Sequence, residues 1–172
     1  LAEYDPNAMQ IESAKKLINT FLEPIKEAES IKLIDSLNRV LAVDLISPIN
    51  VPNYDNSAMD GFGFNISSLK NTKTLIVKNM VLAGKPINSS IKNGEAIQIM
   101  TGGKIPKGVD TVIPIELVKY SNNEITFVDI PKIGANIRKS GEDIKQKDIA
   151  LTKGTLLYPP ELGLIASLGF SK

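Results

Sequence analysis

The stretch "VPNYDNSAMDGFGF", residues 51–64, separates two parts of this chain that differ in character. Pro48 lies just before it and Pro52 is its second residue. Its Asn, Asp, Ser and Gly residues predict a loop that leads into a strand. From there to about residue 130 the chain is rich in Ile, Val and Thr, as strands are, and Asn122-Asn123 predicts a hairpin turn. The stretch therefore marks the entrance to a β-rich block.

Both flanks of this block are predicted to contain a helix. The first would run from Asp5-Pro6 to Pro24, and the last would begin at Pro159-Pro160 and stop at Gly169. In the first helix, apolar residues recur at helical spacing at Ile11, Ala14, Leu17, Ile18, Phe21 and Leu22. Because neither end alone buries enough apolar surface, we expect the two helices to pack together.

These patterns predict a β-rich α+β fold that contains a discontinuous domain. Residues 1–50 and 142–172 would form an outer domain of helix and strand, and residues 51–141 would form a β-rich subdomain inserted into it.

The composition excludes several classes of function. The chain has no Cys and no His, which removes disulfides, thiol nucleophiles, His-based triads and nearly all zinc sites. A metal bound here would be a hard cation on oxygen ligands, such as Mg²⁺. The net charge is +1 and the lysines are scattered, so we expect no nucleic-acid partner. No window of 18 consecutive residues is apolar throughout, so we expect no membrane partner.

Three polar loops that contain glycine are the candidate sites: "SAMDG" at 57–61, "TGGKIPKG" at 101–108 and "RKSGED" at 138–143. The first could be a tight bend at Asp60-Gly61, and the third a solvated charged turn. The second fits a tight turn with positive φ angles better than a backbone cradle for an anion. A phosphate-binding P-loop is excluded, because Val109 and Asp110 stand where Lys and Ser or Thr are required.

Arg39 and Arg138 are the two arginines of a lysine-rich chain. Either could clamp a carboxylate within the fold or bind an oxyanion, since the planar guanidinium suits both. The residues alone thus indicate an anion or hard-metal site near the three loops, without choosing a substrate.

The motifs "SAMDG", "TGG.IP.G.D" and "G.NIR..GEDI" together resemble the N-terminal region of the molybdopterin molybdenumtransferases, the MoeA family, which gephyrin shares in its E domain. The resemblance covers almost the whole chain. It implies the activity of inserting molybdate into adenylylated molybdopterin with release of AMP, in a Mg²⁺-dependent step. The alternative that it leaves open is a non-catalytic scaffold module of the gephyrin type.

The resemblance also implies roles for residues. Asp60, Thr101 and Asp143 match catalytic positions, while Ser57, Arg138 and Glu142 match substrate-binding ones; the metal ligands stay unassigned. Such enzymes are cytoplasmic homodimers that bind a small pterin, and a molybdopterin adenylyltransferase is a further expected partner. The family's pterin-binding and C-terminal domains are absent from the 172 residues, so the fragment alone is expected to be inactive.

Overall fold

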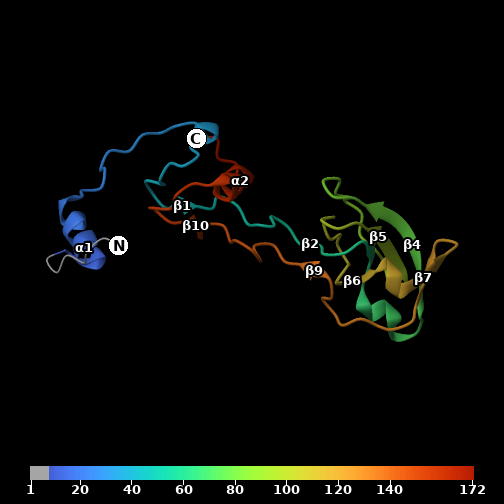
Figure 1. Ribbon diagram of the computed structural model, residues 1–172. Coiled ribbons are helices and arrows are strands. Elements are labelled where there is room, and N and C mark those ends of the chain that lie inside the picture. Colours follow the sequence, from blue (N-terminus) through green and yellow to red (C-terminus); the bar gives the residue numbers. More distant parts are fainter. Residues whose placement is uncertain (1–7) are drawn as a thin grey trace.

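The structure, a computed structural model, describes residues 8–172 as an elongated molecule (Figure 1). Helix α1 (Ile11–Phe21) lies at one end and a six-stranded sheet at the other. Between them lie helix α2 (Pro159–Ser167) and the paired strands β1 (Leu45–Ile46) and β10 (Ile149–Leu151). The predicted β-rich α+β fold, with a β subdomain inserted into an outer part, is confirmed.

The six-stranded sheet is built from residues 61–127. Its strand order is β6 (Thr111–Pro114), β3 (Gly61–Phe64), β5 (Glu95–Ile99), β4 (Thr74–Val81), β8 (Glu124–Phe127) and β7 (Val118–Ser121). All neighbours are antiparallel except β4 and β5. The predicted hairpin is confirmed, because Asn122 and Asn123, both with positive φ, join β7 to β8.

The apolar run from Thr111 to Tyr120 is two strands rather than one. A 3₁₀ turn, η3 (Ile115–Leu117), separates β6 from β7 and carries the chain from one edge of the sheet to the other. A second 3₁₀ turn, η2 (Ile66–Lys70), follows β3. The two edge strands, β6 and β7, are therefore joined by one short turn. The alternation of side chains along the sequence could not reveal this connection.

The core of the sheet lobe lies on both faces of β3: one buried cluster contains Phe62 and Phe64, and a second lies on the side of Gly61 and Gly63 and is made of Val81, Ile97, Ile99 and Val112. Phe62 and Phe64 point to the same side because side chains alternate along a strand, and both are fully buried. The rings of Phe64 and Phe127 meet edge to face with their centroids 4.8 Å apart. Each such side chain contributes about 1.5–3 kcal/mol by burial.

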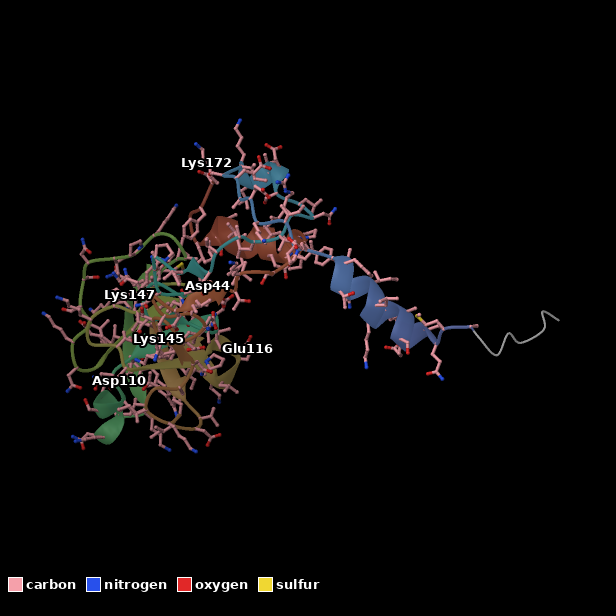
Figure 2. The ribbon with its side chains drawn as sticks, turned by 90° about the vertical axis from the view of Figure 1, so that its left-hand side faces the viewer. Asp44, Asp110, Glu116, Lys145, Lys147 and Lys172 are labelled. Atoms are coloured by element: carbon pink, nitrogen blue, oxygen red, sulfur yellow. The ribbon has the colours of Figure 1, made fainter. Side chains whose placement is uncertain are left out.

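The two flanks of the inserted sheet meet in the middle of the molecule. There, β1 pairs with β10, the Asn38 N–H donates to the carbonyl of Leu157, and the Leu33 N–H donates to Ser171. Leu33 opens the short turn η1 (Leu33–Asp35), which lies against α2. Lys172 lies at this side of the molecule, far from Asp110 in the sheet lobe (Figure 2).

The last helix follows its prediction, and the first is a helix that is shorter than predicted. Helix α2 begins at Pro159, and Gly169, with φ +91°, follows it. Helix α1 begins at Ile11, and the predicted cap residues Asp5 and Pro6 lie outside the described residues. Neither α-helix of the described chain has the length and apolar character that a membrane crossing requires.

The predicted packing of the two helices against each other is wrong. Helix α1 has no buried residue, and Phe21 is 79% exposed at its end. The helix stands clear of the body in both views (Figures 1 and 2). Residues 22–32 form no helix or strand and lead the chain to η1, which occupies the place beside α2 instead. The apolar face of α1 (Ile11, Ala14, Leu17, Ile18 and Phe21) thus has no partner within residues 8–172.

Candidate functional site

The three candidate loops are brought together by a short strand, β2 (Asn56–Ser57). On one side it pairs with β9 (Ile137–Arg138), in the register Asn56 to Arg138 and Ser57 to Ile137. On the other side, the Ser57 N–H donates to the Gly103 carbonyl (3.0 Å) and the Gly102 N–H to the Ser57 carbonyl (2.8 Å). Segments 80 residues apart in sequence therefore lie side by side, between the six-stranded sheet and the part that contains β1, β10 and α2 (Figure 1).

Ser57 is placed inside the fold rather than on its surface. Its side chain is fully buried, and its hydroxyl donates to the carbonyl of Met59 over 2.6 Å. This bond shapes the turn that carries Met59 and Asp60 outward, so the structure gives Ser57 a role in holding the loop. A direct contact with substrate stays a prediction from the resemblance.

Asp60 is joined to Thr101 across the loops. One carboxylate oxygen, Oδ1, accepts both the backbone N–H and the hydroxyl of Thr101, each over 2.7 Å. Asp60 is exposed, and its side chain bonds a residue 41 positions away rather than its own turn. These two donors, the N–H first and then the hydroxyl, hold the pKa of Asp60 below its ordinary value. Its second oxygen, Oδ2, accepts none of these bonds.

We expect the tie between Asp60 and Thr101 to titrate at low pH. A lowered pKa means that the folded state favours the ionised form, so the tie is intact at neutral pH. It is lost only as the pH falls through the lowered pKa, below the ordinary aspartate range. Thr101→Val removes the hydroxyl and keeps the N–H, and should therefore raise the pKa of Asp60 part of the way back. Carboxyl ¹³C shifts followed by NMR during a pH titration measure this, with Thr101→Ser as the control. Equal midpoints in the parent and Thr101→Val would contradict it.

Arg138, Glu142 and Asp143 form a second cluster, on the loop after β9. Arg138 Nη2 donates to both carboxylate oxygens of Asp143 (2.6 Å each), and Arg138 Nε donates to Glu142 (3.1 Å). The carboxylates, Asp143 foremost, raise the pKa of Arg138, so it stays charged. The pKa of Glu142 is lowered, mainly by the bond from the Lys139 backbone N–H and secondly by the bond from Arg138. Arg138 was predicted to clamp a carboxylate or to bind an oxyanion, and in the structure it clamps carboxylates. Arg39 likewise pairs with Glu29.

Asp55 is a member of the site that the sequence patterns did not single out. Its Oδ2 accepts from Lys139 Nζ (2.8 Å) and its Oδ1 accepts the N–H of Ser140 (2.9 Å). The signal for it was weak: a carboxylate directly before the "NSAMDG" stretch, with its partners 84 and 85 positions away. These bonds, chiefly the one from Lys139, lower the pKa of Asp55.

The glycine-rich loop is a tight turn and not an anion cradle. The Gly102 N–H donates to Ser57 and the Gly103 N–H to Met100, while the Thr101 N–H serves Asp60. Gly102 has φ +78°, a conformation that favours glycine. The expectation of a turn with positive φ is confirmed. The N–H groups of the loop donate to other protein groups and are not directed at an anion.

The described part of the chain offers a metal ion few protein ligands. Within residues 8–172, no three acidic side chains converge as a cage for a cation. Mg²⁺ commonly takes one or two protein carboxylates and completes its shell with water and substrate oxygens. Asp60, an exposed residue whose Oδ2 accepts no bond from Thr101, fits such a partial site.

Comparison with known proteins gives one consistent family. The model of the "MoeA N-terminal region (domain I and II)" matches residues 9–169. The molybdopterin molybdenumtransferase of Haemophilus influenzae is 44% identical over 147 residues, which is 85% of this chain and 36% of that protein. The enzyme of the same name from Bacillus subtilis is 34% identical over 154 residues, 84% of this chain and 36% of that protein.

A solved structure gives the same answer for the fold. The crystal structure of the molybdopterin biosynthesis MoeA protein from Pyrococcus horikoshii OT3 superposes with a TM-score of 0.85 at 31% identity. It covers 93% of this chain and 44% of that one. The chain thus spans between about a third and a half of the length of these relatives.

Proposed function

The chain belongs to the family of the MoeA N-terminal region, domains I and II, and on this premise we propose that it is part of an enzyme of molybdenum cofactor biosynthesis. The proposed reaction is insertion of molybdate into adenylylated molybdopterin, with release of AMP. The observation that carries the proposal is the convergence of three distant loops on β2. The turn that carries Asp60, with its bonds to Thr101, follows β2, and Arg138, with its bonds to Asp143, lies on the neighbouring strand β9.

The charges of these loops support a role for Mg²⁺. Arg138 is paired with Glu142 and Asp143, and Lys139 is paired with Asp55. Asp60 is bonded by the neutral donors of Thr101, so it keeps a full negative charge. An incoming oxyanion would be repelled there unless a cation offset that charge. We propose that the Oδ2 of Asp60 faces this cation; Mg²⁺, when bound, would supply the positive charge for both substrates.

The proposed reaction is tested with the protein expressed from its complete reading frame. It is incubated with adenylylated molybdopterin, molybdate and Mg²⁺, and both AMP release and the molybdenum cofactor are measured. Formation of both supports the proposal. Binding of the pterin without AMP release would contradict it and would favour the scaffold role of the gephyrin type.

We propose further that a second copy of the chain covers the apolar face of α1. That face carries Ile11, Leu17, Ile18 and Phe21, each at least 48% exposed. Its neighbours on the helix, such as Glu12, Lys15 and Asn19, are polar, which is the pattern of a helix with one buried stripe. An exposed stripe of this kind marks a binding surface.

Phe21→Glu should weaken the dimer. Burying one large apolar side chain is worth about 1.5–3 kcal/mol, and a symmetric dimer carries the substitution twice, so the dissociation constant should rise roughly 10²–10⁴-fold. Sedimentation velocity of the protein from its complete reading frame measures the shift toward monomer. Asn19→Glu adds the same charge on the polar face and should leave the dimer unchanged. Equal effects of the two substitutions would show that the apolar face is not the interface.

A further inference from the structure

Asp55 lies where two of the candidate loops can be held by one residue. Its carboxylate is bonded to Lys139 and Ser140, at the start of the turn after β9. Its backbone carbonyl accepts the N–H of Ile105, within the glycine-rich loop, over 2.9 Å. Asp55 itself directly precedes β2, the strand that leads to Asp60.

The turn that Asp55 contacts is the one that carries the acidic pair bound by Arg138. The Lys139 N–H donates to Glu142 Oε2 (2.8 Å), and the Glu142 N–H donates back to the Lys139 carbonyl (3.1 Å). A shift of residues 139–140 would therefore move Glu142, and with it the carboxylates that orient Arg138. The geometry of the second cluster depends on where this turn is fixed.

Other bonds keep the turn folded without Asp55. The Gly141 N–H donates to the Pro52 carbonyl (2.9 Å), the Asp143 N–H donates to Val51 (2.9 Å), and Asn50 Nδ2 donates to the Ser140 hydroxyl (3.1 Å). Loss of the Asp55 carboxylate should thus displace residues 139–140 and leave the protein folded.

We infer that Asp55 is a positioning residue for the proposed reaction: its carboxylate fixes the Arg138–Asp143 turn relative to the strand that presents Asp60. This inference rests on the proposed function only for its catalytic consequence. The bond to the Ser140 N–H carries most of the effect. The pair with Lys139 contributes little, because the Lys139 side chain is 67% exposed and such pairs are weak in water.

Three variants of the protein from its complete reading frame separate these contributions. Asp55→Ala removes both bonds, Asp55→Asn keeps an oxygen for the Ser140 N–H, and Lys139→Met removes only the ion pair. For Asp55→Ala we expect kcat for molybdenum insertion to fall about 10–100-fold, as for other residues that orient site groups. The KM for the pterin substrate and the melting temperature should stay near the parental values. Asp55→Asn should recover most of the rate, and Lys139→Met should lose less than about threefold.

Amide hydrogen exchange at Ser140 tests the same inference without any activity. Its exchange should be about tenfold faster in Asp55→Ala than in the parent and should stay slow in Asp55→Asn. Unchanged exchange in Asp55→Ala, or unchanged kcat in that variant of an active parent, would overturn the inference. So would an Asp55→Asn variant as inactive as Asp55→Ala with slow exchange, since the charge would then act directly. A parent that releases no AMP refutes the proposed function, while Ser140 exchange still decides whether Asp55 positions the turn.

Discussion

Replacing Asp60 by Asn is expected to reduce molybdenum insertion about 10²–10³-fold and to leave the fold intact. A preorganised charge at a reacting site is typically worth that factor in rate. The amide oxygen of Asn can still accept the N–H and hydroxyl of Thr101, so the link between the loops survives. What is lost is the negative charge of the carboxylate, whose Oδ2 we propose faces the cation.

The measurement is kcat for AMP release together with thermal unfolding of the same preparation. Asp129→Asn, which changes an exposed aspartate of the same lobe on the segment after β8, is the matched control and should match the parent in both. The melting temperature of Asp60→Asn should stay within about 2 °C of the parental value. An Asp60→Asn protein with full activity would remove Asp60 from the site and would weaken the case for Thr101 and Asp143.

Replacing Gly61 by Ala is expected to be among the most destabilising single substitutions in the sheet lobe. Gly61 is paired between β5 and β6, and a Cβ atom there would lie 2.0 Å from the carbonyl oxygen of Ile113. The colliding atom is backbone, so β3 and β6 would have to separate. Overpacking costs typically 1–3 kcal/mol, and we expect about 3 kcal/mol or more here, against a total stability of about 5–15 kcal/mol. The melting temperature should fall by about 6–12 °C or more.

Gly163→Ala is the control for the loss of a glycine as such. Gly163 lies on the exposed side of α2, and a Cβ there would have no neighbour within 4 Å. Alanine favours a helix over glycine, so this variant should be more stable by about 0.5–1 kcal/mol. Thermal unfolding of the two variants and the parent gives both values. If Gly61→Ala has the melting temperature of the parent, β3 does not approach Ile113 this closely.

The local elements were predictable wherever the chemistry is local. Asn122-Asn123 predicted a hairpin, because Asn tolerates the positive φ that this turn requires. Pro159 and Gly169 marked the beginning and the end of α2. The break between β6 and β7 could not be predicted, because the turn at Ile115–Leu117 has no Gly and no Asn to signal it.

The functions of single glycines and hydroxyls were harder to assign from the chain. Gly61 looked like part of a tight bend, yet it opens a strand and is needed for its closeness to Ile113. Ser57 belongs to a polar loop in the sequence, yet it is fully buried, because β2 lies between β9 and the loop of Gly102 and Gly103. In both cases the deciding neighbours are distant in the chain, and sequence spacing says nothing about such distances.

By itself the sequence determined the inventory: a β-rich block between helical flanks, three polar loops with glycine, and no Cys or His, so a site here has no thiol and no imidazole. Only the tertiary structure decided which of these groups meet. It joined Asp60 to Thr101 and Asp55 to Ser140, and it left the apolar face of α1 without a partner in residues 8–172. The physical reason is that local propensity acts over a few residues, whereas these contacts depend on β2 bonding to segments 45 to 82 positions away.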